Sequence, residues 1–128
     1  MATWDDIRTI TAGLPETHEA SERSWRVKSK PLAWERPLRK ADLEALGAAA
    51  PPEGEILGVR VADVGVKEAL LADDPAVYFT TPHFDGYPAV LVRLAEIPED
   101  ELRDLLRDAW LAQAPKRLAR AYLDDHPA

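Results

Sequence analysis

Apolar side chains recur along the chain with two periods, one typical of helices and one typical of strands. From Trp4 to Leu14 they return every three or four residues, which predicts a helix over Thr3–Ala12. The Thr3 hydroxyl can cap the free amides of the first turn. Asp6, three residues later, takes the place of the usual Glu in a capping box. The glycine and proline that follow end the helix.

Strict alternation begins at Ser24. Over Ser24–Lys28, Trp25 and Val27 share one face and basic residues share the other, which predicts a strand with a basic outer face. The parity of the apolar positions then changes across the following Ser-Lys-Pro, and the next apolar positions include Trp34. A tight turn between two antiparallel strands explains the change.

The remaining patterns extend this order of elements. Apolar positions predict a short helix over Arg39–Leu46 with Leu43 and Leu46 inward, and a strand over Glu55–Val61. Residues 48–54 are predicted to form a loop, followed by a helix over Val64–Leu71 that Asp63 caps. Two further strands are predicted over Ala76–Thr81 and Pro88–Leu94. A long helix that begins at Ile97 and a short helix over Lys116–Leu123 complete the order.

Two of these segments carry specific expectations for the core. In the later strand pair, Val77 and Phe79 alternate with Tyr78 and Thr80, and Val90 and Val92 alternate with Leu91 and Arg93. In the long helix one apolar stripe faces inward: Leu102, Leu105, Leu106, Ala109 and Trp110.

The order of elements and their short connections indicate a fold class. Hairpins favour an antiparallel sheet, and amphipathic helices at both ends of the chain need a sheet face to cover. The sequence therefore predicts an α+β fold with a sheet of about five strands and the N- and C-terminal helices packed on one face. The chain is read as a single domain over residues 1–128.

Composition limits the class of protein. Apolar residues make up 46% of the 128 residues and charged residues 30%, as in globular proteins. The chain has no cysteine, so disulfides and thiolate chemistry are excluded. Apolar runs are too short to span a membrane, and no secretory signal is recognised at the start of the sequence. A cytoplasmic domain with no membrane association is expected.

The charge is uneven along the chain. The net charge is −7, which counts against strong binding to nucleic acid. Residues 21–40 nevertheless hold seven basic residues against two acidic ones. This segment either binds a polyanion or pairs with the protein's own acidic helices. If it binds nucleic acid, the candidate residues are Arg26, Lys28, Lys30, Arg36, Arg39 and Lys40.

The stretch FTTPHFDGYPAVLVRL, residues 79–94, gathers polar and aromatic side chains between two strands. Its Asp-Gly dipeptide is a strong turn signal, because glycine supplies a positive φ, so the main interpretation is a hairpin turn. Loops on rigid hairpins also carry function. The candidate ligand or partner residues are Thr81, His83, Phe84, Asp85 and Tyr87.

Catalysis and metal binding find little support in the sequence. Thr81, His83 and Asp85 supply the residue types of a catalytic triad, but neighbours that alternate along an extended chain rarely converge. His83 and Asp85 also fall short of the three or four ligands of a metal site. We therefore expect no enzyme activity, no metal and no cofactor.

Two further groups of side chains allow alternative readings. Trp25, Trp34 and Trp110 are able to stack on bases, but each occupies an apolar position and is read as core. The acidic stretch Glu99–Asp108 is able to bind cations or a basic partner. The arginines at positions 103 and 107 favour a solvated helix face instead.

The chain resembles the MmcQ/YjbR-like family. The resemblance is carried by Trp25–Trp34, Tyr78–Val92, Ala109-Trp110 and Ala114–Leu118, which occur in the family's order and span nearly the whole chain. It implies an α/β sandwich-like "double wing" fold related to bacterial frataxin. It also implies DNA binding without a catalytic residue, although fold kinship alone does not establish function.

Two function hypotheses remain open. In the first, the basic hairpin around Lys28 binds DNA, mainly through phosphate contacts. In the second, the loop over Thr81–Tyr87 binds a protein partner, a second copy of the chain or a small ligand. The sequence does not choose between them.

Overall fold

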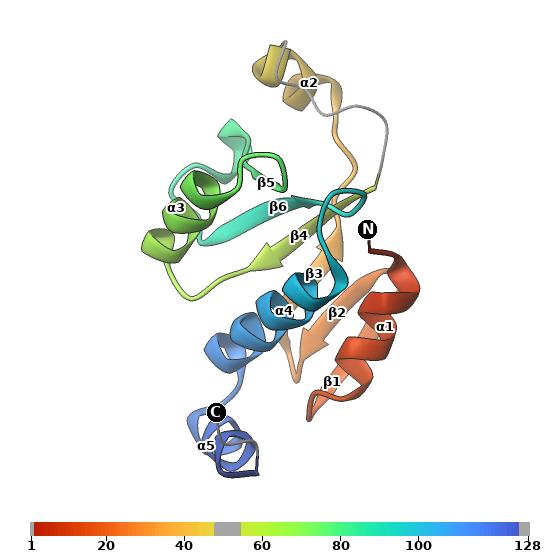
Figure 1. Ribbon diagram of the computed structural model, residues 1–128, viewed down its shortest axis with the longest axis vertical. Coiled ribbons are helices and arrows are strands. Elements are labelled where there is room, and N and C mark those ends of the chain that lie inside the picture. The colour runs from red at the N-terminus through yellow and green to blue at the C-terminus, as the bar shows by residue number, and fades with distance from the viewer. Residues whose placement is uncertain (1, 48–54, 126–128) are drawn as a thin grey trace.

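The structure, a computed structural model, describes residues 2–47 and 55–125 of the chain. Its centre is a six-stranded antiparallel sheet in the order β1-β2-β3-β4-β6-β5 (Figure 1). The elements are α1 (Trp4–Ala12), β1 (Thr17–Ser21), β2 (Ser24–Val27), β3 (Lys30–Glu35), α2 (Lys40–Leu46), β4 (Ile56–Arg60), α3 (Val64–Asp73), β5 (Tyr78–Phe79), the 3-10 turn η2 (Pro82–Phe84), β6 (Ala89–Arg93), α4 (Glu99–Gln113) and α5 (Lys116–Asp125). The predicted α+β class is confirmed, and the loop predicted for residues 48–54 lies outside the described residues.

Helices cover one face of the sheet. Helix α1 packs on the β1 side, α4 crosses β3 and β4, and α3 lies over β5 and β6 (Figure 1). The main core fills the space between these helices and the sheet. It includes the whole predicted stripe of α4, together with Trp25 and Val27 from β2. We call this side of the sheet the helical face.

The ends of the helices follow the local sequence signals. Thr3 caps α1, and its hydroxyl accepts from the Asp6 amide at 3.2 Å while the Asp6 carboxylate accepts from the Thr3 amide at 2.9 Å. The predicted capping box is therefore confirmed. Asp63 caps α3 in a similar way, with its carboxylate accepting from the Val66 amide. Helix α3 continues to Asp73, two residues past its predicted end.

The prediction of about five strands missed β1. Its sequence, THEAS, is almost wholly exposed and has no apolar alternation, so period-two patterning does not reveal it. The strand forms because β2 offers it a hydrogen-bonding edge, with His18 opposite Arg26 and Glu19 opposite Trp25. Pairing with β2 thus determines a strand that the sequence pattern does not predict.

Trp34, which the sequence predicts as core, is only partly buried and packs against a second hydrophobic cluster instead of the main core. An irregularity in the β2–β3 register pairs Trp25 with Ala33 and Arg26 with Pro31, so one extra residue of β3 lies between the two pairs. Ala33 then faces the main core, and Trp34 lies on the opposite face of the sheet. A Cβ built on Gly58 would come within 2.7 Å of the Trp34 ring, so only glycine leaves room for it.

A second, smaller cluster buries part of that opposite face. It joins Ile56, Phe79, Ala89 and Leu91 from β4, β5 and β6 with Phe84 from η2, and Leu38, Leu46 and Trp34 pack against it. Two predictions fail here. Phe79 lies in this cluster rather than in the main core with Val77, and Leu43 is 45% exposed. The central strands are buried on both faces, which strict alternation does not anticipate.

Candidate functional site

The stretch over residues 79–94 forms a hairpin with a structured loop, as predicted. Strands β5 and β6 pair antiparallel, and between them η2 is followed by a tight turn at Asp85-Gly86. Asp85 has φ −58° and ψ 128°, Gly86 has φ 73°, and the Tyr87 amide donates to the Phe84 carbonyl at 3.0 Å. This is type II geometry, in which the glycine takes the left-handed conformation.

A buried lysine from α3 holds this loop in place. Lys67 Nζ donates to the carbonyl oxygen of Phe84 at 2.6 Å and to that of Tyr87 at 3.0 Å. Burial lowers the pKa of Lys67, and the nearby Asp85 carboxylate opposes that shift. From the sequence, Lys67 looked like an ordinary charged helix residue, and only the packing of α3 beside the loop gives it this role.

We predict that Lys67→Met loosens the loop. The substitution leaves two loop carbonyl oxygens without their donor, so the free energy of unfolding should fall by about 1–3 kcal/mol. The backbone amides of Phe84–Tyr87 should exchange with solvent markedly faster. Urea denaturation and amide hydrogen exchange measure both effects. Lys40→Met, at an exposed lysine, is the matched control, and equal behaviour of the two variants would contradict the proposed role of Lys67.

Three of the predicted site residues are structural. Arg36 and Asp42 form an ion pair at 3.1 Å with side chains that are 8% and 6% exposed, and the guanidinium lies over the Phe84 ring at 5.3 Å. The Arg39 amide, followed by Arg36 and the Thr81 hydroxyl, lowers the pKa of Asp42, against the effect of burial. Helix α2 is therefore held to the loop by Arg36, Thr81 and Phe84. Because these three side chains are buried, they are not available to a partner.

The cations of the β2–β3 hairpin are exposed but do not share one face. Arg26 donates to the Ser29 carbonyl at 2.7 Å, across the two-residue turn that joins the strands. Lys28 occupies that turn with φ 54°. Lys30 is paired with Val27, whose side chain lies in the main core, so Lys30 is on the other side of the ribbon from Arg26.

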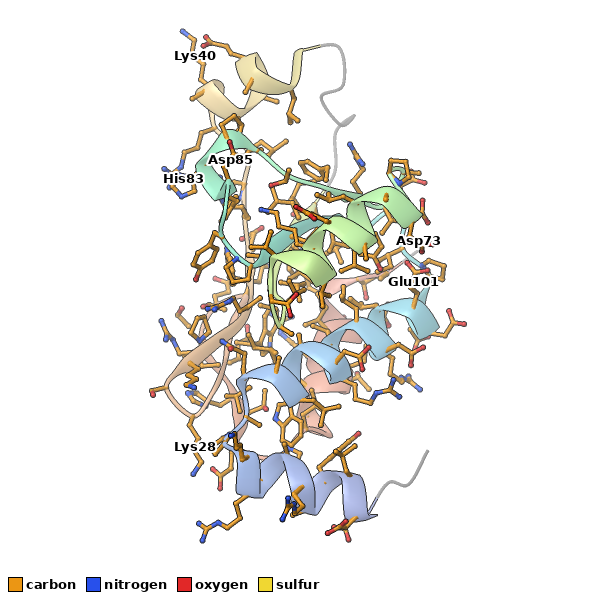
Figure 2. The ribbon with its side chains drawn as sticks, turned by 90° about the vertical axis from the view of Figure 1, so that its left-hand side faces the viewer. Lys28, Lys40, Asp73, His83, Asp85 and Glu101 are labelled. Atoms are coloured by element: carbon orange, nitrogen blue, oxygen red, sulfur yellow. The ribbon has the colours of Figure 1, made fainter. Side chains whose placement is uncertain are left out.

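Part of the sheet face opposite the helical face is exposed. The second cluster covers that face over β4, β5 and β6, whereas over β1–β3 the cross-strand neighbours His18 and Arg26 are both exposed. In Figure 2 the labelled Lys28, His83 and Asp85 lie along one edge of the molecule, and Asp73 and Glu101 lie along the opposite edge. The hairpin and the loop therefore lie on the same side of the protein, separated along its long axis and away from these acids of the helical face.

A residue that the sequence reasoning missed lies beside the loop. Arg60, at the end of β4, lies over the Tyr87 ring at 5.0 Å and donates to the Tyr87 hydroxyl at 3.4 Å. Tyr87 is 40% exposed, and Trp34 is partly exposed beside the same strands. The signal was present: Arg60 follows Leu57 and Val59 out of phase, which places it on the face away from the main core.

We call this surface the open face and define it by the residues His18, Arg26, Lys28, Trp34, Arg60 and Tyr87. It combines cations with partly exposed aromatic rings. Cations attract phosphate groups, and exposed rings are able to stack on bases. The loop residues His83 and Asp85 border it, and Asp85 adds one negative charge at that border. Arg39 and Lys40 are exposed at the start of α2.

Within residues 2–47 and 55–125, no group of three or more histidine and acidic side chains is placed to hold a metal ion. None of the helices in the same ranges combines the length and the apolar character that crossing a membrane requires.

The comparisons with known proteins agree on the family and indicate no activity. The family model described as YjbR matches residues 12–112. Uncharacterized proteins of Mycobacterium tuberculosis and Mycobacterium bovis are each 64% identical to the chain over 125 residues, covering 96% of it and 97% of the relative. The crystal structure of a Deinococcus radiodurans protein with a DUF419 domain has a TM-score of 0.64 at 21% identity. It covers 98% of this chain and 88% of that one, and it shows a shared fold.

Proposed function

Because the chain belongs to the YjbR family, and because its resemblance to that family implies DNA binding, we propose that it is a small non-enzymatic domain that binds DNA through the open face. The observation that carries the proposal is the stacking of Arg60 on the partly exposed Tyr87 ring, on the same sheet face as the exposed Arg26. Arg26 and Lys28 come from the hairpin, Arg60 from β4, and Tyr87 from the loop. The proposed surface thus takes residues from both regions that the sequence offered as rival sites.

The geometry favours single-stranded over duplex DNA. A ribbon that enters a major groove needs its cations aligned, whereas Lys30 and Arg26 lie on different sides of the hairpin. Partly exposed rings beside scattered cations suit a single strand, because its bases are free to stack. Trp34 and Tyr87 are the two rings in question.

The net charge of −7 predicts weak binding that depends strongly on salt. If Arg26, Lys28 and Arg60 each contact one phosphate, the affinity for a single strand should fall roughly 20-fold between about 50 mM and 200 mM salt. A much smaller salt dependence would exclude phosphate contacts as the source of affinity.

A titration with fluorescently labelled single-stranded and duplex DNA tests the proposal. We expect tighter binding of the single strand, loss of that binding in the triple variant Arg26→Ala/Lys28→Ala/Arg60→Ala, and weakening by Trp34→Ala. The control triple variant Arg103→Ala/Arg107→Ala/Arg117→Ala removes the same charge from exposed residues of α4 and α5 and should lose less affinity. Equal losses in the two triple variants, or no binding at low salt, would refute the proposal.

The expectation that the protein is not an enzyme rests on the placement of the loop residues. Thr81 is buried, and its hydroxyl lies close enough to Asp42 to lower the pKa of that carboxyl. His83 is exposed, with its ring edge-on to Phe84 at 4.9 Å. A nucleophile needs a base within hydrogen-bonding reach, and the structure gives Thr81 a carboxylate neighbour that is already paired with Arg36.

A further inference from the structure

A cleft opens on the helical face between α3 and α4. Its volume is about 430 Å³, within the range of sites that hold small molecules. Most of its wall is apolar, with Val61 and Ala62 from the end of β4, Val66 and Leu70 from α3, and Leu105 and Ala109 from α4. The proposed DNA-binding surface does not include this cleft.

Carboxylates surround the apolar wall. Asp73 lies at the end of α3, and Glu101, Asp104 and Asp108 lie along α4. Among the residues that the structure describes, no lysine or arginine lines the cleft. Its charge is therefore wholly negative at neutral pH, and it would attract a cation and repel a phosphate or carboxylate.

The four carboxylates are not equivalent. Asp104 and Asp108 each contact Arg107, at 3.6 Å and 3.4 Å, so their charge is partly balanced. Asp73 and Glu101 form no ion pair with any described residue of the chain. Figure 2 shows these two labelled side chains close together at one edge of the molecule. The cleft thus has one end at which two acids are available to a ligand.

Tyr78 fixes the position of one of these acids. Its ring is buried in the cleft wall, and its hydroxyl donates to Glu101 Oε2 at 2.9 Å. Burial, followed by the Glu101 carboxylate, raises the pKa of Tyr78 far above its ordinary value, so the hydroxyl remains a donor. Among the described residues Glu101 Oε1 accepts no hydrogen bond, and it is free to accept one from a ligand.

We propose that this cleft binds a small organic cation with an apolar body. A primary ammonium group would donate to Asp73 and Glu101, and the apolar part would lie along Leu70 and Leu105. Hydrogen bonds to ionised acceptors are stronger than neutral ones, and burial of the chain adds affinity. A bare metal ion fits less well, because the described acids do not converge into a group that could coordinate one.

This site is independent of the proposed DNA surface. The open face lies on the other side of the sheet, and Figure 2 places Lys28 and Glu101 at opposite edges of the molecule. Variants in the cleft should leave DNA binding unchanged, and variants in the open face should leave cation binding unchanged. Each proposal is therefore able to fail without the other.

The test uses three probes of equal chain length and different charge: n-octylammonium, 1-octanol and octanoate. Binding at pH 7 is followed by chemical-shift changes in two-dimensional NMR spectra of the intact chain. We expect octylammonium to bind most tightly and octanoate least, with the shifts centred on α3 and α4. No saturable binding of octylammonium up to about 10 mM, or equal affinity for the ammonium and the alcohol, would overturn the proposal.

Substitutions locate the site. Asp73→Asn and Glu101→Gln should each weaken octylammonium binding by about five- to tenfold, because each removes a charged acceptor. Ala62→Phe, at an exposed position of the cleft wall, should reduce the affinity for octylammonium and octanol alike. Glu68→Gln removes an exposed acid of α3 outside the cleft and is the matched control. If it weakens binding as much as Glu101→Gln does, the cation responds to net charge and the site is refuted.

Discussion

Replacing Trp110 with alanine is expected to destabilise the domain by about 3–5 kcal/mol, the usual cost of removing a large buried aromatic side chain. Trp110 is completely buried on the inner stripe of α4. Its Nε1 donates to the Pro15 carbonyl at 2.9 Å, and its ring lies 4.9 Å from that of Tyr122. One side chain therefore connects α4 to the segment after α1 and to α5. Because small domains are marginally stable, this loss should unfold much of the protein.

Urea denaturation of three variants checks this prediction. Trp110→Phe keeps most of the apolar contact but loses the hydrogen bond to Pro15, so its loss of stability should be intermediate. Trp34→Ala removes the same side chain from the partly exposed opposite face and should cost clearly less. Equal losses for Trp110→Ala and Trp34→Ala would contradict the assignment of the two tryptophans to different environments.

The second large effect is expected at the buried Arg36–Asp42 pair. Asp42→Ala leaves the Arg36 guanidinium buried without its counter-ion, and such a change typically costs about 3–5 kcal/mol. It also removes the acceptor of the Arg39 amide at the start of α2. Because Arg36 packs on Phe84, the loop should lose amide protection together with α2.

A paired substitution separates the charge from the packing. Arg36→Met/Asp42→Leu removes both charges and keeps apolar bulk, so it should be far less destabilising than Asp42→Ala. If the double variant is as unstable as the single one, the loss comes from packing and not from the unpaired guanidinium. Chemical denaturation and hydrogen exchange at Phe84 supply the measurements.

The same pair predicts a dependence of stability on pH. The folded-state pKa of Asp42 lies below its ordinary value of 3.8, so the folded protein binds fewer protons there than the unfolded chain does. The resulting stabilisation is complete above the unfolded pKa and is lost as the pH falls through the folded pKa. The stability difference between wild type and Asp42→Asn should therefore shrink on acidification below about pH 4. A difference that is constant with pH would contradict the prediction.

The candidate surface was only partly predictable from the sequence. The basic hairpin and the aromatic loop were both identified by their residue types, and their turns were identified by glycine and by the change of parity. Arg36 was grouped with the exposed cations, because a sequence does not show that a carboxylate six residues later accompanies it into the interior. Arg60 was overlooked, because its role depends on Tyr87, which is distant in the chain and lies in the loop that leads into β6, the strand paired with β4.

Local rules explain what the sequence determined by itself. The capping box at Thr3, the cap at Asp63, the apolar stripe of α4 and the alternation of β2 all depend on residues a few positions apart, and each was predicted correctly. Helical and strand periodicities arise from backbone geometry, which acts at that range. The α+β class follows from them, because amphipathic elements in this order need one shared core.

The tertiary structure alone decided what depends on pairing across the sheet. It formed β1 on the edge of β2, turned Trp34 to the face opposite Trp25, and buried Lys67 against the loop that it supports. It also opened the cleft between α3 and α4 and separated the acids there from the cations of the open face. Each of these features joins residues far apart in the chain, and their energies come from contacts that local propensity and period do not contain.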